Sequence, residues 1–309
     1  MKRRLLGFFF LILFFPSFTA AEEGRTLTIA VCQYEVSETL YLDVGAFEAK
    51  AHDIMTRAES SGADLLIIPE YANVMLAFLP DANQLEGVRT IEDGLALLTG
   101  PDRPFPDLKT LFLKRSPMVR KHMDRVWGQG ARLHHLMILA GTYFAEDGGR
   151  LFNRLVLYGP NGEVMYEQDK IHLTPFERGI VELDAGSPQA ARLVTAGGLK
   201  LGFSICRDTF FDDYANLMES AQVWIDLKAN GELYTEETEA LFSRALPSRQ
   251  AEYHFPWGVT ACLNGNFFGL LWQGPSEITR YRKETKTVET VLRADNPGQE
   301  RFLLFTVKQ

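Results

Sequence analysis

Hydrophobic and polar positions along the chain predict strands that alternate with helices. Residues 26–33 (TLTIAVCQ) mix β-branched and apolar side chains, as a first strand does. Residues 47–61 place apolar side chains at helical spacing on one face, and residues 63–69 (ADLLIIP) form a continuously apolar run, typical of a strand buried on both faces. The residues of the helical face are Phe47, Ala51, Ile54, Met55 and Ala58. The pattern therefore predicts a strand, a helix and a buried second strand in succession.

The same signals continue along the chain, apart from residues 71–130, which proline and glycine interrupt. Further strands are predicted at residues 136–144, 152–158, 164–168, 199–205, 221–227, 257–263, 267–272, 287–293 and 301–307, and helices at about 108–125, 214–220 and 236–252. The turn at residues 159–162 (GPNG) joins two of these strands into a hairpin. Strands that alternate with helices and hairpins predict a layered α/β fold. The long excursion over residues 71–130 is a candidate for a wall that covers the substrate.

Composition places the chain among ordinary globular proteins. Of its 309 residues, 46% are hydrophobic and 23% are charged, as expected for a chain that buries a full core. No interior stretch rich in Pro, Gly and Ser resembles a linker, so we expect a single domain over residues 22–309. The formal net charge of -8 argues against nucleic-acid binding, which usually requires a basic surface.

Residues 1–21 have the features of an export signal. Residues 2–4 (KRR) form a basic start, residues 5–15 are almost wholly apolar, and small residues at 19–21 offer a cleavage site after Ala21. The apolar run is about half of the roughly 20 residues that a membrane-spanning helix needs. We therefore predict a cleaved signal peptide, a periplasmic or secreted mature protein, and no stable membrane anchor.

Cysteine usage is unusual for an exported chain, because disulfides form readily outside the cytoplasm. The chain has three cysteines, so at least one thiol is unpaired. Cys32 and Cys262 lie inside apolar, strand-like runs and fit the packing of buried, inert thiols. Cys206 instead stands at the end of a predicted strand, which makes it the candidate for a reactive thiol.

Three polar residues occupy the ends of apolar strands. Glu70 follows ADLLIIP, Lys170 follows VMYEQD, and Cys206 follows LGFSI. Taken singly, the two charged residues fit a solvated sheet edge and the cysteine fits the core. Taken together, they stand where α/β enzymes commonly place their chemistry.

A cysteine, a glutamate and a lysine together can catalyse the cleavage of an amide. The cleavage needs a nucleophile, a base that activates the nucleophile, and donors for the oxyanion of the tetrahedral intermediate. Cys206 would be the nucleophile, and a partly desolvated Glu70 would take its proton and later pass it to the leaving amine. Lys170 and the backbone N–H of Arg207 would stabilise the oxyanion. The chain contains no G-x-S-x-G motif that would favour a serine hydrolase.

These residues resemble those of the nitrilase superfamily, the carbon–nitrogen hydrolases, over residues 27–307. The matching motifs are IAVCQ (29–33), ADLLIIPEY (63–71), KIHLTPFERG (170–179) and LGFSICRD (201–208). The resemblance implies an α/β fold of the four-layer α-β-β-α sandwich type and the same Glu–Lys–Cys triad. A second glutamate of the family corresponds to Glu177, which would hold Lys170 and help to position the substrate. Members commonly pair their sheets into dimers, so a homodimer or a higher homo-oligomer is also implied.

The segment after Cys206 departs from the family pattern. Residues 207–213 (RDTFFDD) lack the Phe-Pro-Glu stretch of many members and the Trp-Glu that usually follows the nucleophile in true nitrilases. This departure favours an amide or a carbamoyl-amide substrate over a nitrile. Hydrolysis of a nitrile, hydrolysis of an N-carbamoyl amine, and acyl transfer from the same thioester to an amine stay open. A non-catalytic binding module is disfavoured, because the glutamates, the lysine and the cysteine of the family pattern are all present.

The remaining polar candidates carry weaker predictions. His134, His135 and His172 lack the spacing of metal ligands, so we expect no metal, and no motif indicates a cofactor. Asp212 and Asp213 fit either recognition of a cationic substrate or the start of a helix. The expected partner is a small-molecule amide whose identity the sequence leaves open.

Overall fold

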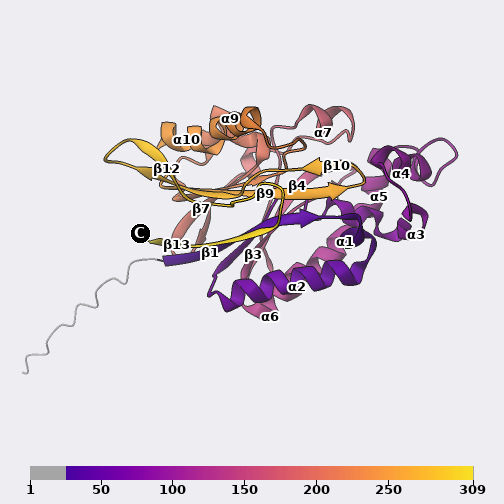
Figure 1. Ribbon diagram of the computed structural model, residues 1–309, viewed down its shortest axis with the longest axis horizontal. Helices are drawn as coiled ribbons and strands as arrows, with labels where there is room; N and C mark the ends of the chain where they lie inside the picture. Colours follow the sequence, from indigo (N-terminus) through magenta and orange to yellow (C-terminus); the bar gives the residue numbers. More distant parts are fainter. Residues whose placement is uncertain (1–25, 309) are drawn as a thin grey trace, which may run out of the picture.

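The computed structural model describes residues 26–308, which form two β-sheets packed between two layers of helices (Figure 1). Helices α9 (Glu236–Arg244) and α10 (Leu246–Tyr253) cover one side of the strands, and α2 (Val44–Ser60) and α6 (Gln129–His134) cover the other. This arrangement confirms the predicted α-β-β-α sandwich. The predicted signal peptide, residues 1–21, lies outside the described residues.

The first sheet has the strand order β5-β4-β3-β2-β1-β13. Its strands are β1 (Thr26–Val36), β2 (Leu65–Ile68), β3 (Met137–Asp147), β4 (Arg150–Tyr158), β5 (Val164–Asp169) and β13 (Arg301–Lys308). The three central strands β1, β2 and β3 are parallel, and β4 and β5 form the predicted antiparallel hairpin. The carboxyl ends of the parallel strands therefore lie at one edge of the sheet.

The second sheet has the strand order β6-β7-β8-β9-β11-β12, and β10 pairs with the end of β9. Its strands are β6 (Val194–Ala196), β7 (Leu199–Ile205), β8 (Val223–Lys228), β9 (Trp257–Phe267), β10 (Leu270–Trp272), β11 (Glu277–Arg282) and β12 (Thr287–Arg293). Strands β7, β8 and β9 are parallel. Short pairing between β1 and β9 joins the two sheets.

Apolar side chains fill the space between the sheets and under the helices. Strands β1, β2, β7, β8 and β9 each contribute to a buried cluster between the two sheets, and α2 packs on the outer face of the first sheet. The predicted apolar face of α2 is confirmed, since its five residues are buried. Asp43 caps this helix by accepting the N–H of Gly45 at 2.8 Å.

Three details of the secondary structure differ from the prediction. The helix predicted over 236–252 is two helices, because Ala245 leaves the helical conformation and Pro247 lies in the first turn of α10, where its missing N–H removes no helical hydrogen bond. The strands predicted at 257–263 and 267–272 are instead the long β9 and the short β10. Strands β6 and β11 were not predicted, because they are short or rich in polar residues.

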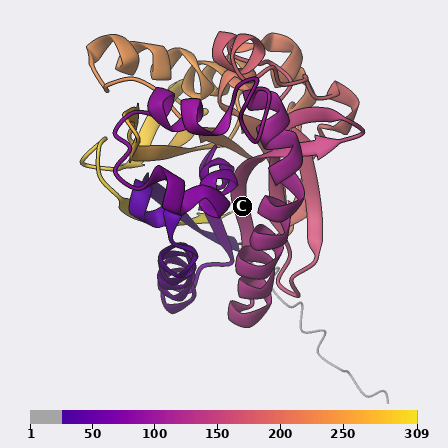
Figure 2. The same ribbon diagram turned by 90° about the vertical axis from the view of Figure 1, so that its right-hand side faces the viewer.

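Residues 71–130, which the sequence leaves largely unassigned, form several short helices and one long one. These are η1 (Val74–Asp81), α3 (Ala82–Leu85), α4 (Ile91–Leu98), α5 (Leu108–Met123) and η2 (Asp124–Gly128). Figure 2 looks onto the end of the molecule where these helices stand in front of the strands. The remaining helices are α1 (Glu38–Leu42), α7 (Pro175–Gly179), η3 (Pro188–Ala190), η4 (Cys206–Phe210) and α8 (Asp212–Leu217). Within residues 26–308, no helix combines the length and the apolar character needed to cross a membrane.

Candidate active site

The ends of three strands bring the predicted residues to one cavity of about 750 Å³. Glu70 follows β2, Lys170 follows β5 directly, and Cys206 begins η4 immediately after β7. All three line the cavity. Residues that are far apart in the sequence thus meet where the carboxyl ends of strands from both sheets converge.

Lys170 is held between two carboxylates. Its Nζ lies 2.8 Å from Oε1 of Glu70 and 3.0 and 2.9 Å from Oε1 and Oε2 of Glu177. The Lys170 and Glu70 side chains are each only 1% exposed, and Glu177 is fully buried. Burying charges is costly unless they are paired, and here the one ammonium contacts both carboxylates at hydrogen-bond distance.

Further donors complete this charged cluster. Asn153 on β4 donates from Nδ2 to Oε1 of Glu70 at 2.9 Å and to Oε1 of Glu177 at 2.8 Å. The hydroxyl of Tyr71 donates to Oε1 of Glu177 at 2.7 Å, and the N–H of Ala229 donates to Oε2 of Glu70 at 2.9 Å. Each carboxylate is therefore fixed from more than one side, which sets its orientation.

Glu177 also caps a helix. Its Oε2 accepts the backbone N–H of Thr174 at 2.8 Å, and the Thr174 hydroxyl accepts the N–H of Glu177 at 3.2 Å. This reciprocal pair is a capping box at the start of α7. The sequence Thr-Pro-Phe-Glu thereby fixes the carboxylate that holds Lys170.

Cys206 has an uncommon backbone conformation. Its φ is +50°, in the left-handed region that a residue with a Cβ adopts rarely. Asp226 accepts the N–H of Cys206 at Oδ1 over 3.0 Å, and the hydroxyl of Thr209 donates to the carbonyl of Cys206 at 2.7 Å. These bonds hold the strained turn, a feature that clusters at functional sites. The N–H of Arg207 lies in the first turn of η4, where amides have no partner within the helix.

Buried Asp208 ties the lysine segment to the cysteine segment. Its Oδ1 accepts the N–H groups of Ile171 and His172 at 3.2 and 2.7 Å, and its Oδ2 accepts the N–H of Ile205 at 3.3 Å. These donors flank Lys170 on one side and Cys206 on the other. Asp208, in the segment that departs from the family pattern, thus has a structural role.

Burial sets the electrostatics of the site. It raises the pKa of Glu70 to about 7, although the Lys170 ammonium opposes the shift. Burial also raises the pKa of the Cys206 thiol to about 12. Burial by itself would raise the pKa of Glu177, but Lys170 and the Thr174 hydrogen bond outweigh it and lower this pKa. At neutral pH the arrangement provides a protonated thiol and a carboxylate close to half ionised.

The rest of the cavity is mainly apolar. Its walls include residues of η1, α4 and α5, namely Val74, Met75, Phe78, Ile91, Leu95, Leu108 and Phe112. The segment 71–130 thus supplies one wall of the cavity. Phe176, Ile180 and Leu241 also line it and are 46%, 60% and 39% exposed, so they stand at its mouth. A substrate that fills this space has a large apolar part.

The structure separates the remaining predicted candidates from the cavity. Asp212 and Asp213 begin α8 and pair with Arg249 and His172 respectively, so the helix-start interpretation fits their position. Cys32 and Cys262 are buried and free. In the part of the chain that the structure describes, no cluster of three or more His, Cys, Asp or Glu side chains has the arrangement of a metal site.

The sequence interpretation missed several residues of the site. Tyr71 and Asn153 were not singled out, nor were Asp226 and Lys228, the two charged residues of β8. A signal was present for the last two, because charged residues inside the apolar run VWIDLK are unusual for a strand that is buried on both faces.

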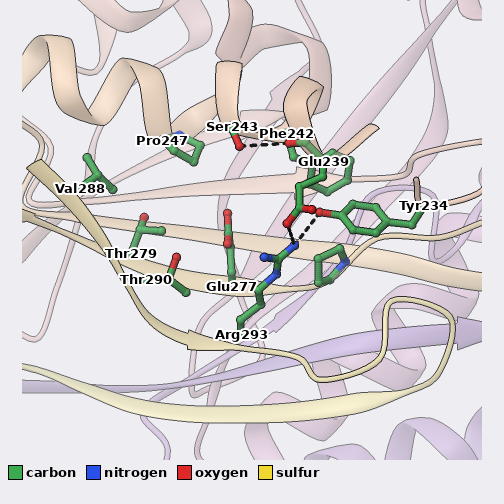
Figure 3. Close-up of a pocket in the computed structure, with 11 residues that line it drawn as sticks. Tyr234, Glu239, Phe242, Ser243, Pro247, Glu277, Thr279, Val288, Thr290 and Arg293 are labelled. Carbon is green, nitrogen blue, oxygen red and sulfur yellow. Dashed lines mark hydrogen bonds and ion pairs between the residues drawn. The ribbon is translucent and has the colours of Figure 1, made fainter. Parts of the chain in front are cut away.

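A second cavity, of about 220 Å³, lies on the other side of Phe242, which lines both cavities. Figure 3 shows Arg293 reaching toward Glu239 and Tyr234 in this smaller cavity. Arg293 Nη2 is 2.7 Å from Glu239 Oε1 and donates to the Tyr234 hydroxyl at 2.6 Å. Glu277 also lines it, and burial raises its pKa.

Comparison with known proteins identifies a family and a fold. The family model for carbon-nitrogen hydrolases matches residues 28–281. The fold is similar to that of the amidase from Nesterenkonia sp. AN1. A double mutant of that amidase in complex with acrylamide has a TM-score of 0.64 and 17% sequence identity, covering 93% of this chain and 92% of that chain. A mutant in complex with butyramide has a TM-score of 0.63 and 17% identity, covering 93% and 91%. No curated protein sequence matches the chain.

Proposed function

The chain belongs to the carbon–nitrogen hydrolase family, and we propose that it hydrolyses a non-peptide amide through a thioester on Cys206. One observation carries the proposal: a thiol, a carboxylate with a pKa of about 7 and a fixed ammonium line the same cavity. Each group matches one requirement of acyl transfer from nitrogen.

In the first half of the reaction, Glu70 takes the proton of the Cys206 thiol as the sulfur attacks the carbonyl carbon. The carbon–sulfur bond forms, and the carbonyl oxygen becomes an oxyanion facing Lys170 Nζ and the N–H of Arg207. Glu70 then gives its proton to the nitrogen, the carbon–nitrogen bond breaks, and ammonia or an amine leaves. The acyl group remains on Cys206 as a thioester.

In the second half, water replaces the amine. Glu70 takes a proton from the water as its oxygen attacks the thioester carbonyl, and the same donors stabilise the second oxyanion. The carbon–sulfur bond then breaks, releasing a carboxylic acid, and Glu70 returns the proton to Cys206. Glu177 takes no proton; with a lowered pKa it stays anionic and holds Lys170 in place.

An amide suits the site better than a nitrile. Structures of the similar amidase contain acrylamide and butyramide, which are small neutral amides. The cavity of about 750 Å³ provides room for a larger molecule, and its apolar walls favour an amide with an extended apolar group.

We also propose that the protein is exported and acts after cleavage of residues 1–21. Support comes from the basic start, the short apolar run and the small residues before position 22. Determining the N-terminal residue of the protein purified from the producing cells tests this: a start at Met1 or Lys2 would contradict export by cleavage, whereas Glu22 is expected.

The catalytic proposal is tested with purified protein and a panel of apolar amides, nitriles and N-carbamoyl amines. We expect amides to be hydrolysed, an acyl adduct on Cys206 to be found by mass spectrometry of the quenched reaction, and Cys206→Ala to abolish both. Cys32→Ala, which removes a buried thiol that does not line the cavity, serves as the matched control and should retain activity. Hydrolysis by Cys206→Ala would refute the role of Cys206 as nucleophile. Adding an amine and looking for a coupled amide distinguishes acyl transfer from hydrolysis.

A further inference from the structure

A second lysine lines the active-site cavity and has no role in the reaction described above. Lys228, the last residue of β8, is 3% exposed. Its Nζ lies 5.6 Å from the ring centroid of Phe210 and 5.1 Å from that of Phe242. Both rings line the cavity together with Lys228 and Cys206. An ammonium is therefore built into an apolar wall beside the nucleophile.

The protein supplies this ammonium with one anionic partner. Asp226 Oδ2 lies 3.0 Å from Lys228 Nζ, but it is a buried oxygen without an aligned hydrogen-bond donor among residues 26–308. Among residues 26–308, this is the one carboxylate that pairs with Lys228. Asp226 is also shared, because its Oδ1 accepts the Cys206 N–H at 3.0 Å and the Ser204 hydroxyl at 3.2 Å.

Lys170, the other buried ammonium of this cavity, binds two carboxylates at once. Three contacts of 2.8 to 3.0 Å connect it to the carboxylates of Glu70 and Glu177. Lys228 has one carboxylate and two aromatic faces in place of two carboxylates. Its charge is nevertheless retained, because Asp226 outweighs burial and raises the pKa of Lys228. Lys228 lines the cavity with one carboxylate partner where Lys170 has two, which leaves its ammonium able to take a second anion.

We propose that Lys228 binds a carboxylate of the substrate, so that the enzyme prefers amides with a carboxylate close to the scissile bond. This inference rests on the proposed amidase function. A charge-assisted hydrogen bond in surroundings of low polarity is strong, and the neighbouring phenyl rings exclude water from it. The acidic residues of the cavity lining are Glu70, which pairs with Lys170, and Glu92 and Glu232. The last two are exposed, so solvent and salt screen their repulsion of a substrate carboxylate.

Lys228 has an alternative role as an activator of the thiol. Its positive charge lowers the pKa of Cys206 against the effect of burial. An activator would raise the reactivity of Cys206 toward every electrophile, whereas a carboxylate-binding residue would favour only anionic ones. Two alkylating reagents separate these roles, because iodoacetate and iodoacetamide differ only in a carboxylate against an amide.

The experiment measures the rate of Cys206 alkylation by each reagent and takes the ratio of iodoacetate to iodoacetamide, relative to free cysteine. Lys228→Met is compared with the wild type, and Lys200→Met, which removes an exposed lysine of β7, is the control for overall charge. We expect the ratio to fall by about tenfold or more in Lys228→Met, because a hydrogen bond to a charged group contributes about 1.5–3 kcal/mol. Lys200→Met should leave the ratio unchanged.

A second variant covers the case in which Lys228→Met leaves Asp226 unpaired and does not fold. Asp226→Asn/Lys228→Met removes both charges and keeps an oxygen that can accept the Cys206 N–H, and we expect the same fall in the ratio. A constant ratio, with or without a parallel fall of both rates, would overturn carboxylate binding. If neither reagent alkylated wild-type Cys206, its role as nucleophile would be overturned. Failure of carboxylate binding and failure of the amidase proposal thus give different results.

Substrates provide an independent readout. N-decanoylglycine carries a carboxylate beside the amide, and N-methyldecanamide does not. For N-decanoylglycine, Lys228→Met should raise KM by about tenfold and change kcat less, and for N-methyldecanamide it should leave KM unchanged. An equal loss of kcat for both substrates would contradict the assignment.

Discussion

The two cavities on either side of Phe242 treat buried charge differently. In the larger cavity, Glu70 and Lys170 are each 1% exposed, and Glu70 also accepts hydrogen bonds from Asn153 on β4 and from the N–H of Ala229, just after β8. In the smaller cavity, the Arg293 and Glu239 side chains are 38% and 47% exposed, and they pair mainly with each other. The first pair is isolated from water, and the second is solvated.

This difference shows why a cluster of charges does not by itself indicate an active site. Solvated pairs keep their ordinary chemistry and contribute little to stability. Burial raises the pKa of Glu70 in the larger cavity to about 7, the range in which a general base works at neutral pH, and it also raises the pKa of Glu277 in the smaller cavity. The smaller cavity is lined by Ser243 but, among the described residues, by no cysteine or lysine. A carboxylate with a raised pKa is therefore a candidate for catalysis only where a thiol and a buried ammonium line the same cavity, as in the larger one.

The largest difference between the cavities is expected when one glutamate in each is replaced by glutamine. Glu70→Gln keeps the shape and the acceptor for Lys170 but cannot take the Cys206 proton, so we expect kcat/KM to fall by about 10³-fold. Glu277→Gln in the smaller cavity should change kcat/KM by less than about twofold. Steady-state kinetics on one apolar amide measures both. Equal losses in the two variants would remove the distinction between the cavities.

A pH profile tests the shifted base without a substitution. The raised pKa of Glu70 means that it is protonated below about pH 7 and ionised above it, so kcat/KM should rise with pH through about 7 and be about 10²-fold lower at pH 5. Glu177 adds no step in this range, because its pKa is lowered. Circular dichroism at pH 5 controls for unfolding. A profile that is flat between pH 5 and pH 8 would contradict the role of Glu70.

Much of the fold was predictable because its strands are buried and apolar. The hairpin of β4 and β5 and the apolar face of α2 follow from local pattern and turn chemistry. The break between α9 and α10 was not predicted, because helical periodicity continues across Ala245. Pro247 was the one local signal of a new helix start. Strand β11 has the polar sequence EITRYR and is defined by its partners β9 and β12, which a local pattern does not contain.

The site was predictable in part for a related reason. Glu70, Lys170 and Cys206 each end a strand, and strand ends are visible in the sequence. Asn153 was hidden because it lies within β4, and its importance depends on two carboxylates that come from other segments. The charge of Lys228 in an apolar strand was visible in the sequence, but its place beside Phe210 and Phe242 exists only after folding.

Each cavity is lined by a tyrosine that hydrogen-bonds to a charged side chain, and replacing each tyrosine is expected to have a smaller effect. Tyr71→Phe removes the hydrogen bond to Glu177, and a bond to a charged group contributes about 1.5–3 kcal/mol. Since Glu177 positions Lys170, we expect kcat/KM to fall by about tenfold and the free energy of unfolding to fall by about 1–2 kcal/mol. Tyr234→Phe, its counterpart in the smaller cavity, loses a bond from exposed Arg293 and should leave kcat/KM unchanged. A larger kinetic effect at Tyr234 would reverse the comparison.

The smallest effect is expected at the solvated ion pair itself. Arg293→Gln breaks the contact with Glu239 but leaves both groups accessible to water, so the free energy of unfolding should fall by less than about 1 kcal/mol. Urea denaturation at low and high salt checks this, because salt screens exposed charges and the difference between variant and wild type should shrink as salt rises. The loss in Tyr71→Phe should persist at high salt, since its hydrogen bond is buried. If Arg293→Gln cost as much as Tyr71→Phe at every salt concentration, the Arg293–Glu239 pair would behave as a buried one, and exposure to water would not be what separates the two cavities.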